Sequence, residues 1–329
     1  MKSFRLEMLR AARLGRNRLP DSAQPLRQFL TGQRDSGGGF VNRQGRSDLY
    51  YTAFGLMCWI ALDGAIDEPL RQYVLAADPA QLDLVHLSCW ARSAALLAET
   101  GGDKLRTAAI SRVTELNVLT PSPSFSPYDA FLAVGIYQDM AQEPRAERNL
   151  AEGVMAALDA CRCRGGGYGG KGLKLPLVSL ASAALVVQWA LDQPLDPTDV
   201  AWLTDQCRSG GFASSPLAKG PDLLSTAVAL LALSCSGADL SAIVHDCRGY
   251  VLGLYDGASC PSKNVARASR PWSEDAKMAE ILMGETPMLR RQALFQRAAS
   301  FHPTADDPHS DCEYSLYGMM ALGICDGIA

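Results

Sequence analysis

The sequence lacks several features that would assign the protein to a class at once. No run of about 18 apolar residues is free of polar interruptions, so no transmembrane helix is predicted. The net charge of the 329 residues is only −4, without a basic stripe, and nucleic acid is therefore not an expected partner. The 10 cysteines are too few for a disulfide scaffold. Since most of them lie in apolar stretches, as free cysteines do in a reducing compartment, we expect a cytoplasmic protein.

Strand alternation is also lacking, and helical patterns take its place. Nearly half of the chain is apolar (48%), which is enough for a large core. Seven segments carry small or apolar residues on all sides, a pattern that predicts helices buried all round; they span residues 48–62, 83–98, 128–140, 177–191, 222–234, 273–283 and 311–323. Amphipathic segments with charged faces predict an outer layer at residues 68–77, 144–159 and 288–299.

A glycine turn closed by an aromatic residue recurs along the chain. It reads Gln33-Arg-Asp-Ser-Gly-Gly-Gly-Phe40, then Cys161-Arg-Cys-Arg-Gly-Gly-Gly-Tyr168, then Gln206-Cys-Arg-Ser-Gly-Gly-Phe212. A supersecondary unit that returns along a chain is the signature of a repeat architecture. We therefore predict an all-α barrel of six to seven helical hairpins around a central cavity, formed as a single domain by residues 23–329.

Residues 1–22 differ from the rest because basic side chains dominate there. In the first eighteen residues one acid, Glu7, stands among Lys2, Arg5, Arg10, Arg13, Arg16 and Arg18. We expect a basic arm in solvent. The alternative is an amphipathic helix that would suit a membrane surface or an acidic partner, with an apolar side made by Phe4, Leu6, Leu9 and Leu14. No apolar core of signal-peptide length follows, so secretion is not expected.

The glycine turns and the segment Ser47-Asp-Leu-Tyr-Tyr-Thr-Ala-Phe54 resemble the β subunits of protein prenyltransferases. The spacing from Phe29-Leu-Thr-Gly-Gln33 to Gly39-Phe40 is similar to the QW repeats of squalene and hopene cyclases. The resemblance covers residues 25–323. It implies an α/α toroid with an apolar central cavity for an isoprenoid, and an isoprenoid diphosphate as the ligand.

The resemblance also implies a zinc site, from which this chain departs. The family holds zinc with an Asp-x-Cys and a His, at positions where this chain has Asp222-Leu-Leu224 and Asp311-Cys-Glu-Tyr314. Asp222 matches the aspartate, whereas Leu224 replaces the cysteine and Tyr314 replaces the histidine. Two of the three zinc ligands are missing, so no cofactor is assigned and zinc stays an open alternative.

Three residues at these positions are the candidate catalytic residues: Asp222, Asp311 and Tyr314. A shifted metal site built from Asp222, His309 and Cys312 is a weaker alternative. It is considered because zinc accepts carboxylate, imidazole and thiolate ligands.

Lysines are the candidates for binding the diphosphate. Lys219 matches a diphosphate-binding lysine of the family, and Lys171 and Lys174 follow the second glycine turn. Helix N-termini gathered at one end of a barrel would favour an anion at the same place. Four residues on the predicted inner helices complete the expected substrate site: Asp48, Tyr50, Tyr51 and Trp90.

Three functions remain open from the sequence. The first is a divergent prenyltransferase-like enzyme that transfers the prenyl group without zinc. The second is a non-catalytic toroid that serves as a binding or scaffold subunit, either with a partner subunit or as a homo-oligomer. The third is a terpene cyclase, although the Asp-x-Asp-Asp acid of those enzymes is absent from the sequence.

Overall fold

A computed structural model describes residues 2–20, 22–98, 102–117, 122, 124–140, 144–170, 172, 174–256, 299–307 and 309–327. Over these residues the chain is mostly helical, which confirms the all-α prediction. One short antiparallel pair, β1 (Cys207–Arg208) with β2 (Gly211–Phe212), forms at the third glycine turn. None of the described helices is both long enough and apolar enough to cross a bilayer.

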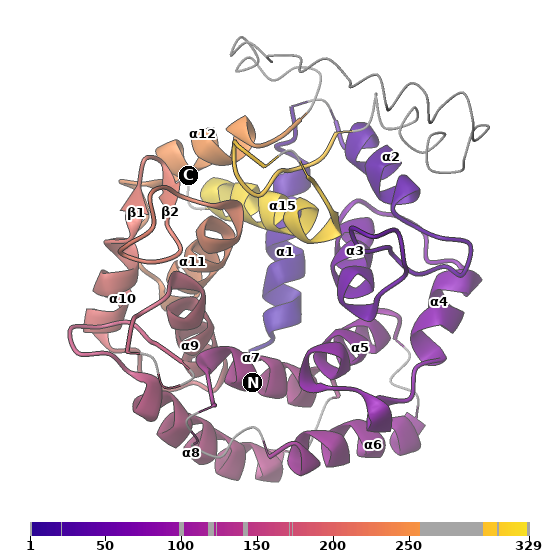
Figure 1. The fold of residues 1–329 in the computed structure, drawn as a ribbon, viewed down its shortest axis with the longest axis horizontal. Coiled ribbons are helices and arrows are strands. Elements are labelled where there is room, and N and C mark those ends of the chain that lie inside the picture. Colours follow the sequence, from indigo (N-terminus) through magenta and orange to yellow (C-terminus); the bar gives the residue numbers. More distant parts are fainter. Residues whose placement is uncertain are drawn as a thin grey trace, which may run out of the picture.

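Six inner helices surround a common centre (Figure 1). They are α3 (Leu49–Ala61), α5 (Leu84–Leu96), α7 (Pro127–Asp139), α9 (Val178–Ala190), α11 (Leu223–Ser236) and α15 (Cys312–Gly327). Each packs against the next, and α15 packs against both α11 and α3, so the cycle of contacts is closed. The predicted inner helix at 273–283 lies outside the described residues, and the cycle closes without it.

Shorter or more polar helices lie outside the inner ones (Figure 1). They are α2 (Gln24–Gly32), α4 (Glu68–Leu75), α6 (Gly102–Glu115), α8 (Pro144–Cys161), α10 (Pro197–Thr204) and α12 (Val244–Gly253), with the 3-10 turn η1 (Pro79–Gln81). The predicted outer segments at 68–77 and 144–159 correspond to α4 and α8. Of the segment at 288–299, only Ala299 is among the described residues.

Aspartates start most of the inner helices. The carboxylates of Asp48, Asp83 and Asp222 accept hydrogen bonds from backbone N–H groups in the first turns of α3, α5 and α11. Asp311 does the same for α15, accepting from the N–H of Tyr314 at 3.1 Å. Such caps satisfy N–H groups that the helix itself leaves without a partner.

The aromatic residue of each glycine turn is a buried anchor on an inner helix. The N–H of Phe40 donates to Thr52 Oγ1 at 3.0 Å, and the N–H of Phe212 donates to Thr226 Oγ1 at 2.9 Å. A Cβ added to Gly55 would lie 2.4 Å from the ring of Phe40, so glycine is required where this ring rests on α3. These turns therefore help to fix the heights at which α3 and α11 begin.

A fourth turn of the same kind was not predicted, because its two halves lie far apart in the sequence. Tyr255 and Phe301 form the same antiparallel bridge as Arg34 and Phe40. The N–H of Asp256 donates to the Ser300 carbonyl at 2.9 Å, as Asp35 does to Gly39 at 3.1 Å. The described residues on either side of 257–298 thus meet in a single turn.

The meeting of the two flanking residues in one turn predicts that the segment between them can be removed. We expect that replacing residues 257–299 with Ser-Gly-Gly, the sequence of residues 36–38, leaves the fold intact. Closing the shorter loop costs less entropy, by roughly 1–2 kcal/mol, so the melting temperature should stay the same or rise. Thermal unfolding followed by circular dichroism measures this. A fall of more than about 5 °C would show that the segment stabilises the helical body.

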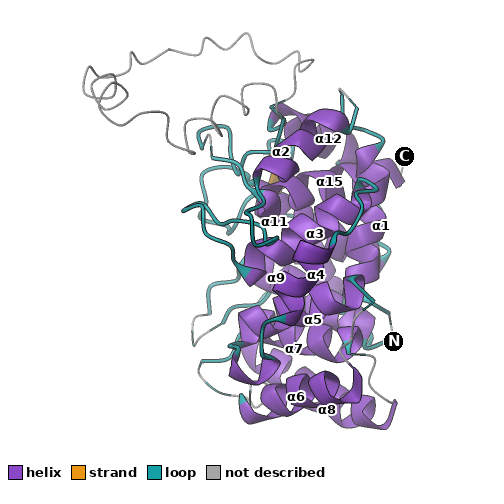
Figure 2. Cartoon of the chain, turned by 90° about the vertical axis from the view of Figure 1, so that its right-hand side faces the viewer, coloured by secondary structure: helices purple, strands orange, loops and turns teal. Residues whose placement is uncertain are grey.

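The basic N-terminal segment forms helix α1 (Phe4–Arg16), which is part of the core. Phe4, Met8 and Ala12 are buried, and α1 packs along α15 and also contacts α3 and α7. It covers the side of the inner helices opposite their N-caps (Figure 2). The expectation of a basic arm in solvent is therefore wrong for these residues. Of the apolar side suggested for a membrane surface, Phe4 and Leu9 are buried within the protein, Leu14 is half-buried and Leu6 is exposed.

The basic residues of this segment meet the carboxyl-terminal ends of the inner helices. The pairs are Lys2 with Asp192, Arg5 with Asp139, Arg16 with Asp63 and Arg18 with Asp326. These aspartates lie at or just beyond the ends of α9, α7, α3 and α15. Helix C-termini carry partial negative charge, which also favours cations there. Most of the excess positive charge is thus paired within the protein.

Candidate functional site

A cavity of about 500 Å³ lies between the inner helices and ends at Met8 of α1. Its lining follows the helical period. Counting from the residue before each inner helix, side chains at positions 2, 6 and 9 line the cavity on most of the helices, and those at position 5 do so on half of them. Positions 2 and 9 are seven residues apart, which is roughly 10 Å along a helix.

The lining forms three layers between the N-caps and α1. The mouth layer is bordered by Ser126, Gly170 and Leu177 and consists of Tyr50, Tyr128, Ser179, Leu224 and Glu313. The middle layer is mostly aromatic and aliphatic and includes Phe54, Phe131, Leu132, Ser182, Val228 and Tyr317. The floor layer consists of Arg92, Val186, Leu231 and Met320, with Met8 below. The cavity is therefore apolar except for a few polar groups at defined heights.

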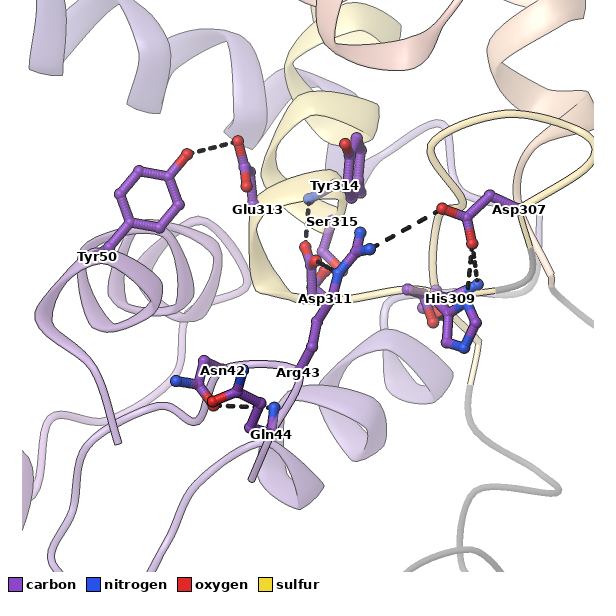
Figure 3. A network of polar contacts seen from close by, with 12 residues as sticks. Asn42, Arg43, Gln44, Tyr50, Asp307, His309, Asp311, Glu313, Tyr314 and Ser315 are labelled. Atoms are coloured by element: carbon purple, nitrogen blue, oxygen red, sulfur yellow. Dashed lines mark hydrogen bonds and ion pairs between the residues drawn. The ribbon is translucent and has the colours of Figure 1, made fainter. Parts of the chain in front are cut away.

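Glu313 is the acidic group of the mouth layer. The hydroxyl of Tyr50 donates to its Oε1 at 2.6 Å (Figure 3). Burial raises the pKa of Glu313 above its usual 4.5, and the neighbouring Asp311 raises it further, against the lowering effect of the Tyr50 hydrogen bond. The carboxyl group is thus held toward its protonated form at the entrance to the cavity.

A pH dependence follows from this pKa. Because the folded protein holds the Glu313 proton to higher pH than the unfolded chain does, the stability from this group is complete below about pH 4.5 and is lost as the pH rises through the raised value. We expect Glu313→Gln, which can still accept from Tyr50, to remove this decline. Urea unfolding of both proteins from acid to neutral pH measures the difference. Parallel stability curves would contradict the prediction.

Arg92 is the basic group of the floor layer. It is 6% exposed, and its guanidinium lies 5.7 Å from the centre of the Phe131 ring. Its nearest carboxylate is Asp139, with 3.9 Å between Nε and Oδ2. Asp139 is itself buried, and its Oδ1 accepts from Arg5 Nε at 2.7 Å. Burial raises the pKa of Asp139, and the two arginines act in the opposite direction.

The candidate catalytic residues serve the helix ends and are not part of the cavity lining. Asp222 caps α11, accepting from the N–H of Ser225 at 2.7 Å and from its hydroxyl at 2.8 Å, and burial raises its pKa. Asp311 accepts from Arg43 Nε at 2.9 Å (Figure 3). The Arg43 guanidinium lies 5.7 Å from the ring centre of Tyr314, whose pKa burial raises to about 12.

Arg43 belongs to the loop after the first glycine turn. Its hydrogen bond to Asp311 joins residues that are 268 positions apart in the sequence. Asp311 and Tyr314 of the last inner helix therefore contact the loop that precedes α3, which joins the two ends of the cycle of helices. Figure 3 shows Arg43 between Asp311 and Asp307, with Tyr50 and Glu313 on the side toward α3.

The lysines do not form the expected cationic site among the described residues. Lys219 and Lys174 are exposed, and neither lines the cavity. Lys174 Nζ donates to the Ala160 carbonyl at 2.8 Å. Lys171 lies outside the described residues.

Of the four residues predicted to contact the substrate, one lines the cavity and three do not. Tyr50 lines the cavity as expected. Asp48 is the cap of α3, and Tyr51 packs against Tyr50 at a ring distance of 5.5 Å outside the lining. The expectation for Trp90 is wrong, because this side chain is completely buried in the core and takes no part in the lining.

The shifted metal site is not formed. No group of three or more His, Cys, Asp or Glu side chains in the described part of the chain could hold a metal ion. His309 is exposed and lies 2.9 Å from Asp307, whereas Cys312 is completely buried beside Cys58. Asp222 is engaged in its cap, so these residues do not converge on one point.

The sequence did not point to Arg92 or Glu313 as part of the cavity lining. Both residues interrupt helices that are otherwise largely apolar, and a charged residue in such a helix is the sequence feature that could have identified them.

Comparison with known proteins assigns neither a family nor a function to the chain. The chain matches no protein-family model, and no curated protein matches it. Functional inference therefore rests on the fold and the cavity.

Proposed function

We propose that the chain is an α/α toroid of the kind formed by prenyltransferase β subunits and terpene cyclases, and that its central cavity binds the hydrocarbon chain of an isoprenoid or a similar lipid. The closed cycle of six inner helices and the recurrent glycine turns support the fold. The observation that carries the function is the cavity itself, about 500 Å³ in volume and lined mainly by aromatic and aliphatic side chains. Ligand pockets of roughly 300–1,000 Å³ with few polar groups are typical for small apolar molecules.

Prenyl transfer from a diphosphate has less support than binding. The described lysines lie outside the cavity lining, and no metal-binding cluster exists among the described residues. A diphosphate leaving group would need several fixed cations near the reacting carbon. Of the described lining residues, Arg92 is the one cation.

Terpene cyclisation is also less supported, although Glu313 supplies a carboxyl group in the cavity. Protonation of an alkene needs a strong acid. Burial raises the pKa of Glu313, which makes it a weaker acid than a carboxyl group in water.

A scaffold role without a ligand would require a large apolar surface for a partner. The large exposed apolar side chains in the described part of the chain are Leu6, Tyr128, Leu175 and Leu217. Scattered apolar residues of this number are ordinary for a protein surface.

The binding of farnesol, a neutral isoprenoid alcohol, tests the proposal. We expect stoichiometric binding by native mass spectrometry and a loss of at least about tenfold in affinity for Ala183→Phe, since a phenyl ring in the middle layer fills the cavity. Ala201→Phe on the exposed face of α10 is the matched control and should bind as the wild type does. Failure of farnesol to bind, or equal binding by Ala183→Phe, would refute the proposal.

A further inference from the structure

Arg92 is a buried cation whose partners are incomplete. A guanidinium has five N–H donors, and a buried one is stable only when these find acceptors. The Nε of Arg92 has no hydrogen-bond partner among the described residues, and 3.9 Å separates it from the nearest carboxylate oxygen. The side chain nevertheless lines the cavity floor, where a ligand can reach it.

Asp139 does not neutralise this charge alone, because it is shared. Its Oδ1 accepts a short hydrogen bond from Arg5, and its Oδ2 faces Arg92 at the longer distance. Two arginines and one carboxylate leave one positive charge at the floor. A second polar group of the cavity, the buried Ser182 hydroxyl, also has no hydrogen-bond partner within the described part of the chain.

The two ionisable lining residues, Glu313 and Arg92, set the orientation of an anionic ligand. Glu313 lies in the mouth layer and Arg92 in the floor layer, roughly 10 Å apart along the helices. The arginine carries a fixed positive charge that favours an anion, whereas the carboxyl group of Glu313 offers no such charge. One cation suits a head group with one negative charge, whereas a diphosphate carries more charge than this floor can balance.

We infer that the ligand is a long-chain carboxylate, bound with its carboxylate on the Arg92 guanidinium at the floor and its hydrocarbon chain directed toward the mouth. The inference rests on the proposed function and adds the head group and the direction of the ligand. Arginine and a carboxylate form charge-assisted, often bidentate hydrogen bonds, which gain strength in an apolar setting. The chain can belong to a fatty acid or to an isoprenoid acid.

A comparison of head groups on matched chains tests the inference. Binding of dodecanoate and 1-dodecanol, and of farnesoate and farnesol, is measured by titration calorimetry on the full chain. We expect the wild type to bind each carboxylate at least about tenfold more tightly than its alcohol. Arg92→Met should abolish this preference while keeping alcohol binding, and Arg92→Lys should retain part of it. Lys174→Met, which removes an exposed cation, is the matched control and should keep the full preference.

The outcomes separate the inference from the proposed function. If the alcohols bind as tightly as the carboxylates to the wild type, the inference is wrong and the cavity proposal stands. If no probe binds, both fail. A preference that survives in Arg92→Met, or binding of farnesyl diphosphate in place of the carboxylates, would place the anion elsewhere and overturn the inference. The wild-type comparison is decisive even if Arg92→Met does not fold. The relative affinity of farnesoate and dodecanoate then distinguishes an isoprenoid acid from a fatty acid.

Discussion

Gly323→Ala is expected to destabilise the protein by about 3 kcal/mol or more, although it adds a single methyl group. A Cβ at Gly323 would lie 1.8 Å from the carbonyl oxygen of Ala11 in α1, and a Cβ at Gly15 would lie 1.8 Å from that of Met319 in α15. Both obstructing atoms belong to the backbone, so no side chain can turn aside. The two helices would have to separate and expose the core beneath α1.

Urea unfolding measures the effect, with Gly153→Ala as the control. Gly153 lies inside α8, and a Cβ there would meet no heavy atom within 4 Å. Alanine favours a helix over glycine by about 1 kcal/mol, so the control should be more stable than the wild type. A loss of less than about 1 kcal/mol for Gly323→Ala would contradict the close packing of α1 on α15.

Asp139→Asn is expected to destabilise the protein by about 3–5 kcal/mol, because it leaves two buried or half-buried arginines without their carboxylate. Asp139 is 4% exposed and is the anion nearest to both Arg5 and Arg92. The amide that replaces it can accept a hydrogen bond but cannot balance charge. The effect should be largest at low salt, where the two positive charges are least screened.

Asp63→Asn is the matched control for this change. Asp63 pairs with Arg16, which like Arg5 belongs to α1, but the side chain of Asp63 is 69% exposed. Its backbone φ of 56° is one that asparagine also adopts. Exposed ion pairs contribute about 0–1 kcal/mol, so the control should be nearly as stable as the wild type. Equal losses for both variants would show that burial of Asp139 is not the source of the effect.

The inner helices were predictable because their sequence is apolar on all sides. The predicted segments 48–62 and 177–191 differ from α3 and α9 by one residue at each end. Helix α1 was not predicted as core, since the partners of its arginines, such as Asp139 and Asp326, lie far away in the sequence. A count of charges along one segment cannot show which charges other helix ends supply.

The candidate site was less predictable than the fold, because inner helices also pack against one another. Tyr50 and Trp90 both lie on inner helices, but Tyr50 is two residues after its N-cap and Trp90 is seven after its own. Of these two positions, only the one two residues after the N-cap faces the cavity. The relative heights of the inner helices had to be known before positions on different helices could be compared. Arg92, at offset nine, could have been found by the same rule.

The packing of α1 on α15 has a consequence for the synthesis of the chain. Arg16 at the end of α1 precedes Cys312 at the start of α15 by 296 residues. At about 5–20 residues per second, α1 waits roughly 15–60 s on the ribosome for the helix that covers it. During that time Phe4, Met8 and Ala12, which are buried in the finished fold, have no α15 to pack against. The nascent chain thus presents an apolar, positively charged helix of the type that chaperones bind, and the charge of α1 helps to keep it soluble until its partner is made.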